Sequence, residues 1–280
     1  MMLPHTGRDY IAAFNPKEYL QECYDGPDHE HIFNIEFLVE ALQLLPTNLR
    51  VLEVGSGPTL HSVAAIAPHA NEIHLADYVP ANLDEIFLWL DHRPEAFNWH
   101  PFIEVALTKA GLPATPEAVE QRAAEMRDKV TRLLVCDVLQ PEPLEEKSEP
   151  YDLVLAPHCT DVAATTLQQW FQVMQNVTTL VKPRGWLFIA VTTGTTHNTV
   201  GTRVFNCVDL TDDDIYQGYV QAGYDPNTYM IAKIPADHKY EFTGICYAIA
   251  QKLPLQKVNL PTTLPDSKNS LNSINSTNSP

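Results

Sequence analysis

The chain has 280 residues, 45% of them hydrophobic, and its 18 basic and 35 acidic residues give a formal net charge of −17 at pH 7. This length and composition allow a full buried core, in one large domain or two small ones. The shortage of lysine and arginine argues against a nucleic-acid partner, because phosphate binding requires a basic face. No apolar run is long enough to span a bilayer, so we also expect no membrane partner.

The first residues and the cysteines both indicate in which cellular compartment the protein is expected. The opening sequence MMLPH lacks the basic and apolar regions of a secretory signal, which predicts a cytoplasmic protein. The cysteines are odd in number and dispersed, with neither a CxxC pair nor a disulfide-like spacing. We therefore expect buried free thiols at Cys23, Cys136, Cys159, Cys207 and Cys246.

Residues 10–45 contain two helical stretches before any strand. The second begins near Asp28, a residue type that caps helix N-termini well. We interpret this segment as a helical lid over a ligand crevice.

The next segment is an apolar strand that ends in residues 53–59, with the sequence EVGSGPT. It combines an acidic residue with a glycine-rich turn, and backbone without a Cβ atom approaches a ligand closely. The turn therefore favours a small nucleoside-bearing cofactor. A nicotinamide-dependent dehydrogenase is the competing interpretation, but residues 55–60 lack the third glycine of that fingerprint and contain Pro58.

Polar residues also end the following apolar segments. Asp77 closes the second strand about 20 residues after the glycine turn, the distance at which nucleotide-binding α/β folds place a carboxylate on ribose hydroxyls. Residues 133–138 and 152–157 are the third and fourth strands. Since ligands of open α/β sheets bind outside the carboxyl ends of the strands, these endings predict one shared crevice.

Helices alternate with these strands. Apolar residues recur at helical spacing in residues 83–90 and 167–181, and the turn at 182–185 ends the second of these helices before a fifth strand at 186–191. Two more strand candidates, 229–234 and 245–251, are expected to pair antiparallel at one edge. The alternation predicts an α/β fold with a doubly wound, mostly parallel sheet and helices on both faces.

Two segments lie outside this alternation. Residues 101–131 contain prolines followed by a charged helical run, and we interpret them as an insertion. Residues 254–280 are rich in Pro, Ser, Asn and Thr, which predicts a disordered low-complexity tail after a single domain at 1–253.

Two local patterns suggest other chemistry. His29 and His31 are two positions apart and diverge on a helix, so we expect no metal site there or elsewhere. His158 and Cys159, with Asp161 nearby, suggest a thiol nucleophile, but no distant histidine or oxyanion signature accompanies them. We interpret this segment as pocket lining.

Several segments together resemble one known family. Residues 53–59, with 14–20 (FNPKEYL) upstream, are similar to the nicotinamide, phenylethanolamine and thioether or indolethylamine methyltransferases. Further similar segments are 76–78 with Asn82, 94–99, 136–138 and 180–185, so that the resemblance spans roughly residues 10–253. It implies a monomeric class I methyltransferase that has a seven-stranded sheet and uses S-adenosyl-L-methionine.

The resemblance also implies which residues bind the cofactor. Tyr19 and Tyr24 match tyrosines that close over it, Asp77 matches the ribose contact, and His61 stands where the family has tyrosine. The complete expected set is Tyr10, Tyr19, Tyr24, Gly55, Ser56, Gly57, Thr59, His61, Asp77, Tyr78, Asn82, Asp137, Val138 and Pro157. Tyr19 and Tyr24 are five positions apart, so without the resemblance they are interpreted as ordinary partly buried aromatics.

The methyl-acceptor side departs from the family. Members acting on nicotinamide or phenylethanolamines carry an acidic residue after the fifth strand, where this chain has Val191, so these two substrates are not expected. Glu241 is our first candidate for an amine anchor or proton acceptor and Asp237 the second, although the position of Glu241 is also compatible with an exposed loop charge. The other expected acceptor-side residues are His158, Thr192, Thr195, His197 and Cys207.

These observations predict an S-adenosylmethionine-dependent small-molecule N-methyltransferase of specialised metabolism, acting on a primary or secondary amine. In-line methyl transfer needs an aligned acceptor lone pair in a closed pocket, and an amine must lose a proton to a nearby group. Two alternatives remain. One is an S- or O-methyltransferase, and the other is a noncatalytic cofactor-binding relative that lost its acceptor site.

Overall fold

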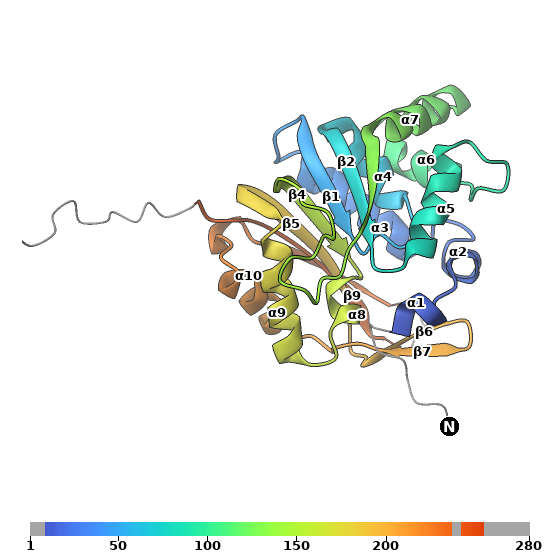
Figure 1. Ribbon diagram of the computed structural model, residues 1–280. Coiled ribbons are helices and arrows are strands. Elements are labelled where there is room, and N and C mark those ends of the chain that lie inside the picture. The colour runs from blue at the N-terminus through green and yellow to red at the C-terminus, as the bar shows by residue number, and fades with distance from the viewer. Residues whose placement is uncertain (1–8, 237–241, 255–280) are drawn as a thin grey trace, which may run out of the picture.

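The computed structural model describes residues 9–236 and 242–254, and within them seven strands form one mixed sheet (Figure 1). The strands are β1 (Leu49–Val54), β2 (Ala70–Asp77), β3 (Val130–Val135), β4 (Tyr151–Pro157), β5 (Val181–Thr193), β8 (Met230–Pro235) and β9 (Gly244–Gln251). Across the sheet they follow the order β3-β2-β1-β4-β5-β9-β8. The first five strands are parallel, and β9 pairs antiparallel with both β5 and β8. The predicted α/β sheet with an antiparallel edge pair is confirmed.

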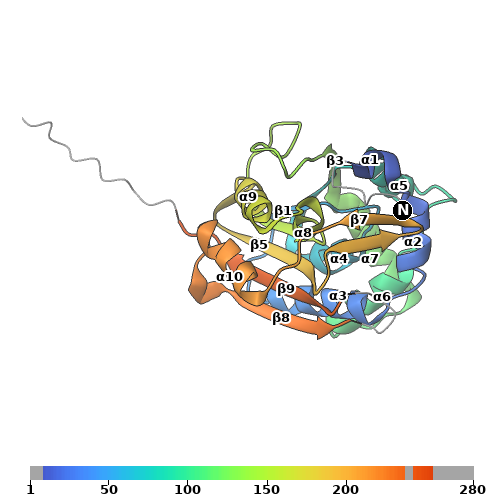
Figure 2. The same cartoon turned by 90° about the horizontal axis from the view of Figure 1, so that it is seen from below.

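Helices cover both faces of this sheet (Figure 2). The helices are α1 (Tyr10–Ala13), α2 (Pro16–Cys23), α3 (His29–Leu42), α4 (His61–Ile66), α5 (Pro80–Leu90), α6 (His100–Lys109), α7 (Pro116–Lys129), α8 (Thr160–Ala163), α9 (Leu167–Thr178) and α10 (Asp212–Gln221). Side chains of a strand alternate between the two faces. Leu153 and Leu155 of β4 join the core under α3 to α7, while Val154 and Ala156 join the core under α9 and α10.

The predicted helical segment 10–45 divides into two parts with different positions. Asp28 is the N-cap of α3 as expected, because its side chain accepts hydrogen bonds from the backbone N–H groups of Glu30 and His31. However, α3 is a core helix that packs on α4 and α6 and buries Ile35 and Leu38. Only α1 and α2 lie over the strand ends. The predicted insertion contains most of α6 and all of α7, which extend the core on the same face of the sheet.

The sequence suggested that the turn at 182–185 ends a helix, but in the structure these residues belong to β5. Helix α9 already ends at Thr178, and Val181 pairs with Tyr151 as the first residue of β5. The next pair is Leu153 with Trp186, so the residues between form a bulge in β5. Proline has no N–H to donate to a ladder, and a bulge is where a strand accommodates Pro183.

Three of the predicted features lie wholly or mostly outside the described residues. They are Asp237, Glu241 and the tail, of which only Pro254 is described. Within the described ranges, none of the helices has the length and apolarity needed to cross a membrane.

A polar network ties the amino ends of β1, β2 and β4 together. The Arg50 guanidinium donates to Glu72 Oε2 over 2.9 Å and to Ser148 Oγ over 3.0 Å, and its carbon lies 4.2 Å from the ring centre of Tyr151. The Tyr151 hydroxyl in turn lies 2.7 Å from Nδ1 of the buried His74. This network stabilises the end of the sheet opposite the strand carboxyl ends.

Replacing Arg50 with lysine should therefore destabilise the fold. A lysine keeps the charge but loses the planar fork and the stacking on Tyr151, so we expect Arg50→Lys to lower the free energy of unfolding by about 1–2 kcal/mol. Arg93→Lys is the matched control, since Arg93 pairs with Asp91 at the surface and both side chains are about half exposed. That control should change stability by less than about 0.5 kcal/mol. Urea unfolding of the three proteins measures the difference, and equal midpoints would contradict the assignment.

Candidate active site

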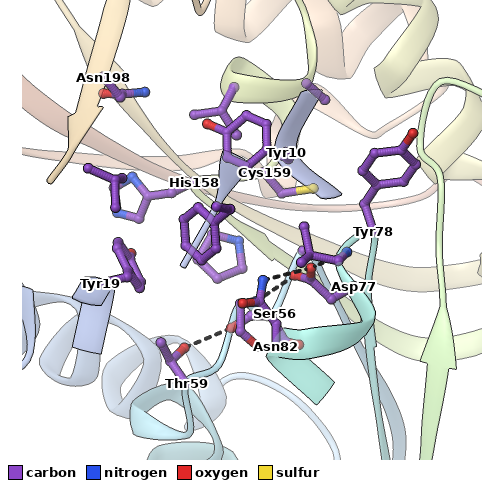
Figure 3. A pocket seen from close by; sticks show the side chains of 18 of the residues that line it. Tyr10, Tyr19, Ser56, Thr59, Asp77, Tyr78, Asn82, His158, Cys159 and Asn198 are labelled. Carbon is purple, nitrogen blue, oxygen red and sulfur yellow. Dashed lines mark hydrogen bonds between the residues drawn. The ribbon is translucent and has the colours of Figure 1, made fainter. Parts of the chain in front are cut away.

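The principal cavity lies at the carboxyl ends of the strands, where the strand order reverses. In the sheet β1 lies between β2 and β4, so the chain runs to one side after β1 and to the other after β3. Ligands of open α/β sheets bind at such a switch point. The cavity there has a volume of about 510 Å³ (Figure 3), within the range of about 300–1,000 Å³ that is usual for small-molecule sites.

The turn after β1 forms the floor of this cavity. Gly55 and Gly57 adopt φ angles of 64° and 57°, in the left-handed region that side chains disfavour. A Cβ atom on Gly55 would lie 2.5 Å from both Cβ and Sγ of Cys159, which follows β4. The turn is locked from beneath, because Ser56 N donates to Ala76 O and Thr59 Oγ1 donates to Ser56 O. At Gly55 and Gly57, the floor of the cavity therefore exposes backbone atoms and no side chain.

Asp77, at the end of β2, organises the neighbouring wall. Its carboxylate accepts hydrogen bonds from Gly57 N at 2.7 Å, Val79 N at 2.8 Å and Asn82 Nδ2 at 2.9 Å. Burial raises the pKa of Asp77 even though these donors favour the charged form. Asn82 is thereby fixed with its amide oxygen buried and without a hydrogen-bond partner. The wall thus has an acceptor available for a ligand donor.

The loop after β3 continues this wall with a mixed surface. Asp137 accepts from Leu139 N and from Gln140 Nε2, each over 3.0 Å, so its carboxylate holds its own turn. Val138 and Leu139 line the cavity beside it. An apolar ring can pack here with a carboxylate at its edge.

Two segments distant in the sequence form the roof. They are α1 and α2 and a hairpin of β6 (His197–Val200) and β7 (Arg203–Asn206). Glu18 Oε2 pairs with Arg203 Nη1 at 3.0 Å, Gly201 N donates to Glu22 Oε2 over 2.8 Å, and the rings of Tyr10 and Phe205 lie 4.1 Å apart. The sequence analysis missed this hairpin. The available signal was two short strand-like runs separated by a two-residue Gly-Thr turn.

An aromatic cluster joins the roof to the core. Tyr24 lies just past the end of α2, which brings its ring within 5.6 Å of that of Tyr19 despite their spacing of five. Its ring also contacts those of His31 and His61, with centroids 4.4 and 5.4 Å away. Burial, together with the nearby His31 and His158, lowers the pKa of His61 well below its usual value, so His61 is neutral.

A histidine–carboxylate pair lies on the side of the cavity away from Asp77. Glu30 Oε1, in the first turn of α3, is 3.1 Å from His158 Nε2, which follows β4. In Figure 3, His158 lies toward Tyr19 and Asn198, whereas Asp77 and Tyr78 occupy the other side. The sequence analysis identified His158 but not Glu30, because no local pattern shows that the start of α3 lies against the end of β4.

All of the residues expected to bind the cofactor line this one cavity, and so do His158, Thr192 and His197. Thr195 and Cys207 do not line it, contrary to expectation. Thr195 Oγ1 donates to His197 O over 2.8 Å and Cys207 Sγ lies 3.8 Å from Thr195 O, so these buried side chains fasten the base of the β6–β7 hairpin instead. Burial raises the pKa of Cys207 to about 12, which keeps it a thiol.

Lining residues that the sequence analysis did not identify come mainly from the helices and the hairpin. They are Phe14, Cys23, Glu30, His31, Val79, Cys136, Leu139, Val162, Ala163, Asn198, Thr199, Val200 and Phe242. Cys159 also lines the cavity, as expected, and burial raises the pKa of its thiol well above the usual value. In the described part of the chain, no three His, Cys, Asp or Glu side chains are grouped closely enough to hold a metal ion.

Comparison with known proteins assigns this site to a family. The sequence profile of the NNMT/PNMT/TEMT family matches residues 4–253. The chain belongs to this family. The indolethylamine N-methyltransferase of Oryctolagus cuniculus is 29% identical in an alignment of 265 positions that covers 89% of this chain and 97% of that protein. The nicotinamide N-methyltransferase of Homo sapiens is 29% identical in an alignment of 229 positions that covers 78% of this chain and 85% of that protein.

The fold agrees with this assignment. The crystal structure of the 1,6-didemethyltoxoflavin-N1-methyltransferase of Burkholderia thailandensis superposes with a TM-score of 0.52 at 15% identity, covering 90% of this chain and 93% of that one. The chain has the class I methyltransferase fold. It is an S-adenosylmethionine-dependent methyltransferase.

The two glycines of the floor provide a matched test of the turn. An alanine at either position lowers the free energy of unfolding by about 1–2 kcal/mol, because a residue with a Cβ atom disfavours the left-handed conformation. At Gly57 the new Cβ meets only Thr59 Cγ2, at 3.8 Å, whereas at Gly55 it collides with Cys159. This collision at Gly55 costs a further amount of about 1–3 kcal/mol, as is typical of overpacking. We therefore expect Gly55→Ala to be the more destabilising change in urea unfolding, and the reverse ranking would refute the close approach of the two loops.

Proposed function

We propose that the protein transfers the methyl group of S-adenosylmethionine to the nitrogen of a small primary or secondary amine. The observation that carries this proposal is that one cavity has two chemically different sides. The Asp77 side combines a glycine turn, a fixed amide and an apolar wall, which suits an adenosyl group. The opposite side contains the Glu30–His158 pair, which suits a basic nitrogen. Nitrogen is also the methyl acceptor in the names of both relatives described above.

The described residues fit the cofactor. Asn82 Oδ1 is a buried acceptor without a partner, and leaving such a group unpaired costs about 1–3 kcal/mol that a ligand donor recovers. Asp77 orients Asn82 through its Nδ2 and faces the same space for a ribose hydroxyl. Gly55 and Gly57 leave room for the methionine part beside the floor. Asp137 and Val138 are assigned to the adenine.

The chemistry depends mainly on positioning. When bound, S-adenosylmethionine supplies an electrophilic methyl group on a positively charged sulfur. The aromatic roof of Tyr10, Tyr19 and Tyr24 excludes water, and burial raises the pKa of each of these phenols, so all three are neutral. Holding the acceptor lone pair in line with the methyl group supplies most of the rate, because a bimolecular reaction becomes effectively unimolecular. The nitrogen must be neutral when it attacks, so a proton acceptor in the site is useful.

We further infer a cytoplasmic, monomeric enzyme without a nucleic-acid partner. The five cysteines are free thiols, which suits a reducing compartment. A monomer is what the resemblance to the family implies. A net charge of −17 opposes phosphate binding. Light scattering after size-exclusion chromatography tests the monomer.

Removing the Asp77 carboxylate should weaken cofactor binding. Asp77→Ala leaves Gly57 N and Asn82 Nδ2 without their acceptor and frees the turn that they hold. We expect the dissociation constant for S-adenosylmethionine to rise at least tenfold, about 1.4 kcal/mol, as measured by isothermal titration calorimetry. Asp91→Ala, at an exposed ion pair, is the control and should bind as the wild type does. An Asp77→Ala protein with undiminished affinity would count against the ribose assignment.

A product screen can show directly whether nitrogen, sulfur or oxygen receives the methyl group. Methyl-labelled S-adenosylmethionine is incubated with the protein and a panel of biogenic, guanidino and cyclic amines, thiols and phenols, and products are followed by mass spectrometry. We expect repeated turnover with amines, and poor turnover with nicotinamide and phenylethanolamine because Val191 offers no carboxylate. Label found only in thiols or phenols would replace the proposal with S- or O-methylation. Cofactor binding without turnover on any acceptor would favour a noncatalytic relative.

A further inference from the structure

The end of β5 offers no carboxylate to an acceptor. Val191 is fully buried in the core under α9 and α10. Thr192, the next residue, lines the cavity, but its hydroxyl donates to Asp161 Oδ2 over 2.9 Å. A basic acceptor must therefore find its anionic partner elsewhere.

Three carboxylates are found among the described residues that line the cavity: Glu30, Asp77 and Asp137. Asp77 holds the glycine turn and Asn82, and Asp137 holds the loop after β3. Both lie at strand ends on the side assigned to the adenosyl group. Within the described residues, Glu30 is thus the carboxylate that remains for the acceptor side.

The position of Glu30 is fixed by the local fold. The Asp28 capping box anchors the first turn of α3, and Glu30 lies in that turn. Its partner His158 has a φ of 48°, which is uncommon for a residue with a side chain. The backbone N–H of His158 donates to Ala190 O over 2.7 Å, which holds this conformation. Both side chains remain about a quarter exposed, 24% for Glu30 and 26% for His158, so the pair is supported from behind and open to the cavity.

We propose that Glu30 and His158 form the proton-accepting pair of the acceptor side, with His158 as the base and Glu30 as its positioning residue. The inference rests on the proposed function and names the residues that serve it. An ionised carboxylate only accepts hydrogen bonds, so Nε2 of the neutral imidazole carries the hydrogen and the ring lone pair is on Nδ1.

The step balances as follows for a primary or secondary amine. The nitrogen lone pair forms the bond to the methyl carbon, and the electron pair of the broken carbon–sulfur bond stays on sulfur, which becomes a neutral thioether. One proton of the nitrogen passes to His158, before or during transfer, and then to water. The Glu30 carboxylate stabilises the imidazolium while it exists.

Other titratable groups surround the pair. Burial alone would lower the pKa of His158, but the hydrogen bond and charge of Glu30, with the charge of Asp161 from α8, outweigh burial and raise it. His61 on α4 is held neutral by burial. His31 of α3 and Asp28, its N-cap, interact with His61. The neutral tyrosines of the roof complete the surroundings. Because the neutral imidazole is the active form, kcat/KM should rise with pH as His158 loses its proton.

The test compares Glu30→Gln and His158→Gln with Glu40→Gln, an exposed control on the same helix. All are assayed with the best amine of the panel, so that the titration of the substrate is common to every profile. Glu30→Gln should move the acid limb of kcat/KM to lower pH, since the main cause of the raised pKa is gone. His158→Gln should remove that limb and lower kcat about a hundredfold. Both should retain S-adenosylmethionine binding by calorimetry.

The pKa of His158 can also be measured without enzyme turnover. An NMR titration of the His158 ring in the cofactor-free protein should give a pKa above the ordinary value, and Glu30→Gln should lower it. Glu30→Asp keeps the charge and should retain part of the shift, even if Glu30→Gln unfolds. An unchanged acid limb and ring pKa in Glu30→Gln, in a wild-type enzyme that methylates the amine, would overturn the pair and leave the proposed function standing. No turnover of amines by the wild type would instead sink the proposed function.

Discussion

The close approach of two backbone turns is the constraint on which the rest of the site depends. Gly55, after β1, lies against Cys159, after β4, with no room for a side chain between them. These strands are neighbours at the point where the sheet order reverses, so the contact fixes the floor of the cavity and the start of the β4 loop together. His158 directly precedes Cys159, and its position therefore depends on the same contact. The positions of the glycine turn and of His158 are thus fixed by the same contact.

The buried acids beneath the cavity follow from the same geometry. Burial raises the pKa of Glu53 to about 8 and also raises those of Asp77 and Asp161. Glu53 is fully buried, and a hydrogen bond from Ser62 offsets only part of the effect of burial on its pKa. A positively charged ligand nearby favours the ionised form of such groups. If the sulfonium binds above this floor, as proposed, its charge offsets part of the cost of ionising these acids.

The sequence predicted the sheet, and it predicted which residues at the strand ends line one cavity, because both depend on local patterns. Each strand with its polar ending is a continuous pattern, and Gly55, Asp77 and Asp137 are each read from one short segment. The β6–β7 hairpin of the roof and Glu30 of the acceptor side were not predicted, since their places depend on contacts over long separations. Glu18 contacts Arg203, and Glu30 contacts His158, although each pair is far apart in the sequence. Cys207 was misplaced for the same reason, because only the fold shows that it fastens the hairpin from behind.

The proposed anionic partner Glu30 lies at the start of α3 and not at the end of β5, and this position affects what the enzyme can select. A carboxylate on the central sheet would approach an acceptor from the rigid floor, whereas Glu30 approaches it from a helix that packs beside the roof. The aromatic contacts of His31 with Tyr24 and His61 couple that helix turn to the residues that close the site. Closure of the roof and placement of the anionic partner are then linked, since the same helix turn takes part in both. An acceptor that fills the space under Tyr19 and Tyr24 is held where its nitrogen meets His158, and a smaller one gains less from the same contacts.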